Sequence, residues 1–249
     1  MTDWIRGKVV DNQHWTNNLF SLTIDADVAP FRAGQYTNLG LDIDGQRVSD
    51  PYSILSAPDE RSLEFFFYTR LEGELSTALT RLQTGDPIWV DAQPAGGFTL
   101  EAVPDSDELL LLATGTGVAP FLSMLKTEEP WQRFRQIVLV YAVRYHQDLR
   151  YRELFDQLHL RYPGRFTLIP VVSREAVPDT LSGHIPERLA DGSLKRVGGL
   201  TLDPAASQVM LCGNPGMIRD TVSLLREEGF RDGEQNRDVH GQLHYESYW

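Results

Sequence analysis

The sequence is poor in cysteine, in positive charge and in long apolar runs. Its single cysteine, Cys212, excludes an internal disulfide, a zinc site built on several cysteines and an iron–sulfur cluster held by four thiolates, so we expect no metal. No apolar window reaches the roughly 18 residues of a membrane-spanning helix, and the N-terminus has no signal-peptide core. We therefore expect a cytoplasmic protein that does not enter a membrane. The 23 Lys and Arg against 35 Asp and Glu give a net charge of −12, which argues against nucleic-acid binding.

The composition is that of a folded globular protein. The 249 residues are 41% hydrophobic and 23% charged. This length suffices for two domains of about 100–150 residues each. The hydrophobic pattern changes near residues 103–107, which predicts domains over 1–103 and 104–249.

The first domain is predicted to be an antiparallel barrel or sandwich. In "LFSLTID", Phe20, Leu22 and Ile24 alternate with polar residues, as in a half-buried strand. Further short strands are expected at 34–45, 51–55, 63–70 and 87–92, separated by turn residues such as Asp44-Gly45. One helix is expected over 76–85, with Ser76 as its N-cap.

The second domain is predicted to be a doubly wound α/β domain. Apolar strands alternate with helical segments, which indicates a parallel sheet covered on both faces. The strands are expected at 108–113, 137–143, 166–173 and 207–213, and the helices at 117–126, 149–162, 185–190 and 215–228.

A glycine-rich turn follows the first of these strands. In "ATGTGVAPF", Gly115 and Gly117 allow a sharp turn and close approach to a ligand, and the helix that follows offers N–H groups to phosphate. The third glycine of the dinucleotide fingerprint is replaced by Pro120. A plain strand–helix turn explains this motif equally well. Because ligands bind beyond the carboxyl ends of the strands in doubly wound sheets, the context favours a cofactor.

Polar residues follow the other strands too. Arg144 ends the second strand, and Ser173 and Arg174 end the third. Arginine at such a position can clamp a phosphate, although a solvated surface charge is the common alternative for any one of them. His184 could add a third donor. Cys212 ends the last strand, where it could be inert packing, a nucleophile, or the wall of a pocket that holds a flat ring.

Two features of the first half and the C-terminus also indicate a cofactor. Tyr52 and Ser53 could stack on a ring system and hydrogen-bond to it, although such residues often form an ordinary turn. The segment from Gly73 to Ser76 is predicted to begin a helix, which is an anion site. The chain ends in "HYESYW", whose aromatic residues need a docking partner to be ordered.

Together these motifs resemble the ferredoxin/flavodoxin–NADP⁺ reductase family, in its short bacterial form. The order of the motifs carries the resemblance: Tyr-Ser, Gly-x-x-Ser, "GTGVAP", "CGNP" and a terminal aromatic pair. The resemblance implies an N-terminal antiparallel FAD barrel and a C-terminal five-stranded parallel NADP(H) domain, whose aromatic tail returns to the flavin. It implies a monomer that shuttles electrons between NADPH and ferredoxin or flavodoxin.

The resemblance also implies the site residues. Those for FAD are Asp50, Pro51, Tyr52, Ser53, Phe66, Phe67, Tyr68, Thr69, Gly73, Glu74, Leu75, Ser76, Thr116, Tyr248 and Trp249. Those for NADP(H) are Gly115, Thr116, Gly117, Arg144, Tyr145, Ser173, Arg174, Ser182, His184, Cys212 and Gly213. Those nearest the chemistry are Tyr52, Ser53, Cys212, Glu246 and Tyr248. Cys212 would pack beside the nicotinamide without forming a covalent bond, and Glu246 would relay a proton.

Two positions depart from the family pattern. Asp50 stands where the family has an arginine that pairs with the FAD pyrophosphate, so attraction becomes repulsion unless Arg47 or the backbone compensates. His184 stands where relatives carry an arginine for the 2′-phosphate, which weakens the expectation of strict NADPH use. The alternatives are a flavin reductase, an oxygenase-system reductase component, or a flavin-depleted binding protein that has lost catalysis.

Overall fold

The computed structural model describes residues 2–69, 74–233 and 241–247. Its contacts divide the chain into two compact units. Unit 1 comprises residues 1–99 and 119–127, and unit 2 comprises residues 100–118 and 128–249. The predicted boundary between domains 1–103 and 104–249 stays a prediction. The contacts place residues 119–127 in unit 1, although they follow that boundary in the chain.

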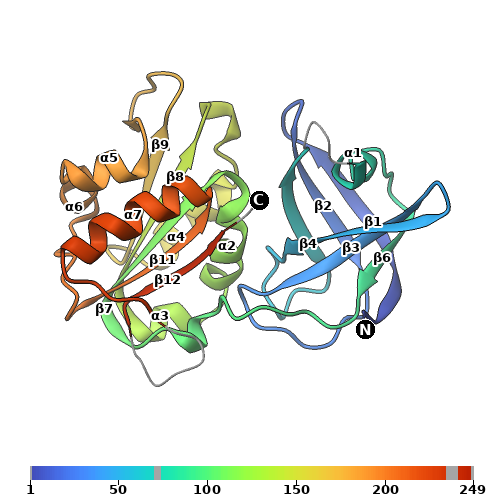
Figure 1. Ribbon diagram of the computed structural model, residues 1–249, viewed down its shortest axis with the longest axis horizontal. Coiled ribbons are helices and arrows are strands. Elements are labelled where there is room, and N and C mark those ends of the chain that lie inside the picture. Colours follow the sequence, from blue (N-terminus) through green and yellow to red (C-terminus); the bar gives the residue numbers. More distant parts are fainter. Residues whose placement is uncertain (1, 70–73, 234–240, 248–249) are drawn as a thin grey trace. The chain divides into compact units, whose positions relative to one another are not determined.

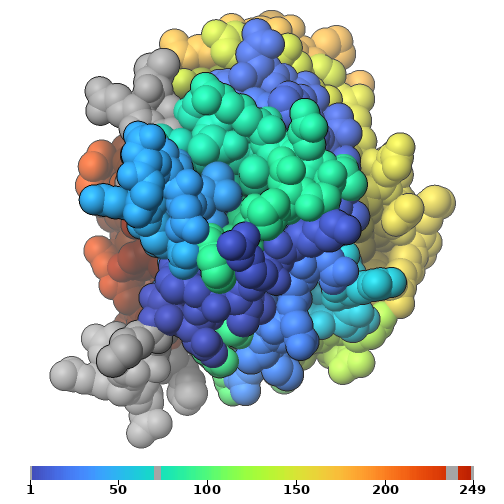
Figure 2. Space-filling model, turned by 90° about the vertical axis from the view of Figure 1, so that its right-hand side faces the viewer, coloured from blue at the N-terminus to red at the C-terminus, as the bar shows by residue number. Residues whose placement is uncertain are grey.

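Unit 1 is an antiparallel sheet that curls into a barrel. Its strands are β1 (Trp4–His14), β2 (Leu19–Asp25), β3 (Tyr36–Ile43), β4 (Gln46–Ser53), β5 (Leu63–Tyr68) and β6 (Pro87–Asp91), in the order β4-β3-β6-β1-β2-β5. An isolated antiparallel bridge between Ile54 and Phe65 connects the two ends of this order. Figure 2 shows the outer surface of this unit, on which dark-blue and lighter-blue residues of the N-terminal strands are exposed; in the sheet, β6 lies between β1 and β3. The antiparallel fold of the first domain is confirmed.

The alternation seen in the sequence places the barrel core. Phe20, Leu22 and Ile24 are at most 4% exposed and pack with the other inward-facing residues of the barrel. Asp44 and Gly45 both have positive φ, 50° and 80°, and form the tight turn between β3 and β4, as expected of an Asp-Gly hairpin.

The helix of this barrel differs from the prediction. Helix α1 runs over Glu74–Leu79, so Ser76 lies inside the helix and is not its N-cap. The helix also ends well before Gly85. The side chain of Asn12, on β1, donates hydrogen bonds to the carbonyl oxygens of Leu79 and Leu82, at 3.0 and 2.8 Å. This long-range cap satisfies the carbonyl groups at the helix end, and a local sequence pattern cannot reveal it.

Unit 2 is a parallel sheet with helices on both faces. Its strands are β7 (Ser106–Thr114), β8 (Phe134–Val143), β9 (Phe166–Val172), β10 (Leu181–Ser182), β11 (Ser207–Gly213) and β12 (Leu243–Ser247). Their order in the described part is β10-β9-β8-β7-β11-β12, with every pairing parallel. The predicted α/β class is confirmed, and the two-residue β10 is a sixth strand at one edge.

The helices divide between the two faces of this sheet. The remaining elements are η1 (Leu100–Ala102), η2 (Gly115–Val118), α2 (Ala119–Leu125), α3 (Glu129–Arg133), η3 (His146–Asp148), α4 (Arg152–Arg161), α5 (Ile185–Ala190), α6 (Ser193–Gly198) and α7 (Pro215–Glu227). Leu110 and Leu112 belong to one apolar cluster with residues of α5, α6 and α7, and Figure 1 shows α7 crossing that face. On the other face, Tyr141 packs against Phe155 of α4. Within the described residues, no helix is long and apolar enough to cross a membrane.

A buried carboxylate holds the amino-terminal edge of this sheet. Glu108, at the start of β7, is 3% exposed. It accepts hydrogen bonds from the backbone N–H and hydroxyl of Thr201, from the N–H of Leu202 and from the hydroxyl of Ser207, at 2.7–3.1 Å. Burial alone would raise the pKa of this carboxyl, but the hydrogen bonds from Thr201, Ser207 and Leu202 outweigh it and lower the pKa below its ordinary value of 4.5.

We predict that Glu108→Gln lowers the free energy of unfolding by about 2 kcal/mol at neutral pH, because a carboxamide cannot accept from all four donors. The pKa of Glu108 is lower in the folded chain than in the unfolded chain. The stabilisation is therefore complete above a pH of about 4.5, the ordinary pKa, and is lost as the pH falls below that value. Urea midpoints measured between pH 3 and 8 should therefore converge for wild type and variant at the acid end. Glu227→Gln, at an exposed position on α7, is the matched control and should change little at any pH. An equal, pH-independent loss in both variants would contradict the assignment.

Candidate functional site

The predicted flavin residues of β4 and β5 lie together in unit 1. The ring of Tyr52 meets the ring of Phe67 edge to face, with centroids 5.6 Å apart. The bridge between Ile54 and Phe65 places the preceding residue, Ser53, next to Phe66 in the antiparallel register. Ser53 is 8% exposed, whereas Tyr52 is half-buried. The end of β4 therefore offers an aromatic ring and a hydroxyl group close together.

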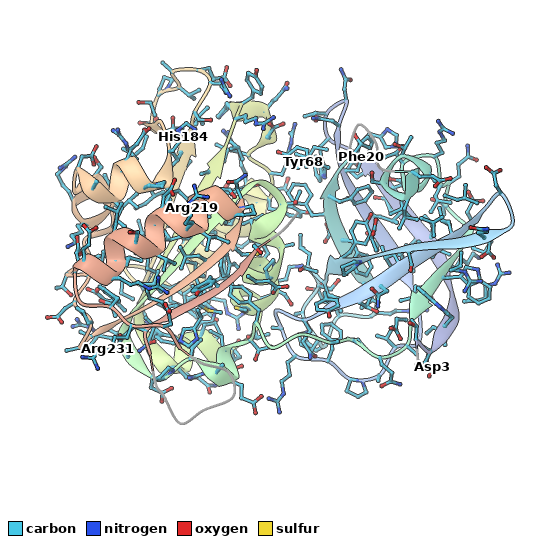
Figure 3. All side chains as sticks on the ribbon, viewed as in Figure 1. Asp3, Phe20, Tyr68, His184, Arg219 and Arg231 are labelled. Atoms are coloured by element: carbon cyan, nitrogen blue, oxygen red, sulfur yellow. The ribbon has the colours of Figure 1, made fainter. Side chains whose placement is uncertain are left out.

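The neighbouring predicted residues lie on β5 and α1. Tyr68 is half-buried at the end of β5, where Figure 3 labels it, and the N–H of Thr69 donates to the carbonyl oxygen of Asn18 at 2.9 Å. Helix α1 packs against β4. Its first residue, Glu74, is exposed, and the next two, Leu75 and Ser76, are buried. Gly73, Tyr248 and Trp249 lie outside the described residues.

Asp50 has no compensating charge from Arg47. Asp50 and Pro51 are exposed on β4, and Asp50 lies on the same strand face as Tyr52, two residues on. Arg47 is three residues away on the same strand and therefore on the opposite face. Its guanidinium binds Asp42 at 2.7 Å and lies over the ring of Trp89, 4.0 Å from the centroid. Of the two compensations named above, these contacts do not support the one by Arg47, and the one by the backbone stays a prediction.

The predicted dinucleotide residues gather at one edge of unit 2. Because all its strands are parallel, their carboxyl ends meet at the same edge of the sheet. Gly115 follows β7, Arg144 follows β8 and Ser173 follows β9, whereas Cys212 and Glu246 lie at the ends of β11 and β12.

The glycine turn packs closely against the end of β11. A Cβ atom on Gly117 would lie 2.5 Å from the carbonyl oxygen of Cys212, and one on Gly213 would lie 2.1 Å from the hydroxyl of Thr114. Gly115 and Gly213 both have positive φ, 55° and 130°. The contacts at Gly117 and Gly213 leave no room for a side chain, and the positive φ of Gly115 favours glycine there, so these glycines allow the loops to meet closely.

Two residues of this edge were missed by the sequence analysis. The hydroxyl of Thr114 accepts from the N–H of Asn214 at 2.8 Å and joins the ends of β7 and β11. The side chain of Asn214 caps α7 by accepting from the N–H groups of Gly216 and Met217, at 2.9 and 3.1 Å. The Asn-Pro pair in "CGNP" was a signal for this cap, since Asn is favoured at the N-cap and Pro at the next position.

The two predicted arginines lie on adjacent loops. The N–H of Arg174 donates to the carbonyl oxygen of Arg144 at 2.9 Å, and the N–H of Ser173 donates to that of Val143 at 3.1 Å. Both arginines are exposed, and Tyr145 is 47% exposed. A phosphate could therefore reach both guanidinium groups from solvent.

The same loops also carry carboxylates that the sequence analysis did not single out. Glu175 accepts from the N–H of His146 at 2.5 Å. Asp148 is buried, and burial raises its pKa above the ordinary value despite the nearby Arg150 and Arg144. The two exposed arginines and these two carboxylates therefore lie on the same pair of loops.

His184 lies beside the carboxylate of Glu187. Ser182 lies on β10, and His184 precedes α5, where Figure 3 labels it. The N–H of His184 donates to Glu187 at 3.1 Å, and its ring Nδ1 lies 3.6 Å from the same carboxylate. This carboxylate opposes binding of a further negative group at His184.

Cys212 and Glu246 are paired across neighbouring strands. They occupy directly opposite positions in the parallel register of β11 and β12. Cys212 is completely buried. Burial raises the pKa of Glu246 to about 7, so this carboxyl can change its protonation state near neutral pH. Among the residues with described positions, no cluster of His, Cys, Asp or Glu could hold a metal ion.

Comparisons with known proteins agree with this arrangement. A family model described as an oxidoreductase NAD-binding domain matches residues 111–223. The flavodoxin/ferredoxin–NADP reductase of Escherichia coli (strain K12) is 47% identical over 221 residues, covering 89% of each chain. That of Buchnera aphidicola subsp. Schizaphis graminum is 37% identical and is covered over its whole length. A crystal structure of a ferredoxin NADP⁺ reductase from Neisseria gonorrhoeae with bound FAD and NADP has a TM-score of 0.92 and 31% identity, with 99% of both chains covered. The chain belongs to the flavodoxin/ferredoxin–NADP reductase family.

Proposed function

We propose that this protein exchanges hydride with NADP(H) and single electrons with ferredoxin or flavodoxin, using bound FAD. The observation that carries the proposal is the set of polar loops at the carboxyl edge of a parallel sheet, in a chain 47% identical to a flavodoxin/ferredoxin–NADP reductase. The alternatives, a flavin reductase, an oxygenase-system component or a flavin-depleted binding protein, are not favoured by these relatives.

Unit 1 holds the flavin in this proposal. FAD supplies the ability to accept two electrons together and to release them singly. Tyr52 would stack on the flavin ring, Ser53 would hydrogen-bond to it, and the start of α1 would bind the pyrophosphate. The contact of Tyr52 with Phe67 and the packing of α1 against β4 support these roles, because they bring the proposed residues to one end of the barrel. Asp50 weakens this site by repelling phosphate.

Unit 2 holds the dinucleotide. The turn from Gly115 to Gly117 receives the nicotinamide half, and Arg144 and Arg174 bind the phosphates. The exposure of both arginines and the close packing of the glycine loops support this assignment. Cys212 positions the nicotinamide ring by packing and does not react.

Glu246 handles the proton that remains when electrons leave singly. A hydride carries two electrons and one proton, and transfer of both electrons to one-electron carriers leaves that proton to be released. A carboxyl with a pKa of about 7 can accept it near neutral pH. We further propose a cytoplasmic monomer that binds no nucleic acid.

The first prediction of the proposed function is that protein loaded with FAD is bleached by NADPH under anaerobic conditions. Reduction is followed by the flavin absorbance near 450 nm, which is a property of the cofactor itself. We expect NADPH to act faster than NADH, with a modest ratio because Glu187 lies beside His184. Failure of NADPH to bleach bound FAD would refute the function, and equal rates with NADH would refute the 2′-phosphate site.

The second prediction is that Asp50→Arg tightens FAD binding at least tenfold. Reversing one charge beside a phosphate changes the interaction by about 1–4 kcal/mol before screening, and about 1.4 kcal/mol corresponds to a factor of ten. The dissociation constant is measured by flavin fluorescence at two salt concentrations, and the gain should shrink at high salt. Asp27→Arg, at an exposed position after β2, makes the same charge change and should leave FAD binding unaltered. Equal effects of the two variants would show that net charge alone is responsible.

The third prediction concerns the pH dependence of turnover with a one-electron carrier. Because Glu246 must be deprotonated to accept the proton, kcat should rise with pH through an inflection near 7. Glu246→Gln should lower kcat at pH 8 by at least tenfold and abolish the inflection, with both cofactors still bound. Glu227→Gln should keep the wild-type profile. An inflection that persists in Glu246→Gln would assign the titration to another group.

A further inference from the structure

Two neighbouring loops of unit 2 carry the proposed phosphate-binding arginines. Arg144 lies on the loop after β8, and Arg174 lies on the loop after β9, the strand beside it in the sheet (Figure 1). The pairing of the two strands ends at Val143 and Val172. The separation of the two arginines therefore depends on contacts that the loops make with each other.

The loop after β8 turns sharply just beyond Arg144. His146–Asp148 form the short helix η3. The first N–H groups of a helix have no partner within it, and Tyr145, the residue before η3, provides no side-chain cap. The groups that accept these N–H bonds therefore hold the turn in place.

Two carboxylates accept N–H groups at this turn. Asp148, which is 6% exposed, accepts from the N–H of Tyr145 within the same loop. Glu175, on the loop after β9, accepts from the N–H of His146 at 2.5 Å. A hydrogen bond to a carboxylate is stronger than one to a neutral oxygen. Glu175 therefore ties the turn to the neighbouring loop, which also carries Arg174.

The contact of Glu175 is a second point of attachment between the two loops. The first is the backbone hydrogen bond from the N–H of Arg174 to the carbonyl oxygen of Arg144, at 2.9 Å. Glu175 reaches the chain two residues beyond Arg144, at His146. With both points held, one loop cannot pivot about the other. Both arginine side chains then start from backbone segments with a fixed separation, which favours binding of one phosphate by two guanidinium groups.

We propose that Glu175 is a positioning residue for phosphate binding by Arg144 and Arg174. Its carboxylate holds the turn that follows one arginine against the loop that carries the other. The inference rests on the proposed function, because that function assigns the phosphates to this pair. The same carboxylate repels a bound phosphate, so the hydrogen bond and the charge of Glu175 act in opposite directions.

The experiment separates the hydrogen bond from the charge. Binding of 2′,5′-ADP to the full chain loaded with FAD is measured by titration calorimetry. Glu175→Gln and Glu175→Ala remove the same charge, but glutamine keeps a carbonyl oxygen that can accept from the N–H of His146. Because Glu175 is exposed, we expect both variants to fold.

Glu175→Gln should bind 2′,5′-ADP at least as tightly as wild type, because it loses the repulsion and keeps the acceptor. Glu175→Ala should bind at least fivefold more weakly than Glu175→Gln. Since the two variants have equal charge, this ratio should be the same at low and at high salt.

A second set of variants tests whether Glu175 acts through Arg144. In an Arg144→Ala background the turn no longer carries a guanidinium group, so its position matters little to the phosphate. Glu175→Ala and Glu175→Gln should then bind 2′,5′-ADP within twofold of each other. A general structural effect of Glu175 would instead give the same ratio in both backgrounds.

The matched control is Glu153→Ala, which removes the same charge at an exposed position in the first turn of α4. Its affinity should stay within twofold of wild type. Equal affinities of Glu175→Ala and Glu175→Gln, or a fivefold ratio that persists without Arg144, would overturn the inference and leave the phosphate site standing. Absence of 2′,5′-ADP binding by wild type would refute the phosphate site itself and the inference with it.

Discussion

In a parallel sheet, the carboxyl ends of all strands lie at the same edge. The loops that follow the strands therefore meet there. In unit 2 this geometry brings together the carboxyl ends of strands that are spread along the chain from Thr114 to Ser247. The glycines then decide how closely the loops can meet: Gly117 and Gly213 occupy positions where a Cβ atom would collide with the neighbouring strand end. The proposed roles of Arg144, Cys212 and Glu246 all depend on this shared edge, because the three residues belong to different strands or loops and the parallel sheet brings those strand ends together.

The sequence predicted those features that depend on local periodicity. Phe20, Leu22 and Ile24 alternate because their strand has one buried face, and Val138 to Tyr141 form an unbroken apolar run because helices cover both faces of theirs. Helix α1 was predicted too long, because its end is set by Asn12 from another strand. The transfer of residues 119–127 to unit 1 was also not predicted, since the pattern of a buried helix does not say which partner buries it.

In the candidate site, too, the sequence marked single residues but did not show which other residues they contact. The motifs located Tyr52, the glycine turn and Cys212, because unusual residue types mark them. They did not reveal the contact of Glu187 with His184 or that of Thr114 with Asn214, although the Asn-Pro pair marked Asn214 itself as an N-cap. The suggestion that Arg47 offsets Asp50 failed for a simpler reason: residues three apart on a strand lie on opposite faces, and Asp42 and Trp89 already hold that guanidinium.

Glu108 and Glu246 lie at opposite edges of the same sheet, and their pKa values are shifted in opposite directions. Glu108 is buried and Glu246 is half-buried, and burial by itself raises the pKa of a carboxyl. At the amino-terminal edge, hydrogen bonds from Thr201, Leu202 and Ser207 reverse this effect, so Glu108 keeps its charge and holds a loop in place. At the carboxyl edge, burial remains the governing cause for Glu246, and its pKa rises to about 7. A carboxylate that accepts several hydrogen bonds has a low pKa and stays charged at neutral pH. A carboxyl that is buried with fewer donors has a raised pKa and can exchange a proton near neutral pH. The difference in donors, more than the difference in burial, therefore separates the pKa of Glu108 from that of Glu246, and the role proposed for Glu246 rests on that difference.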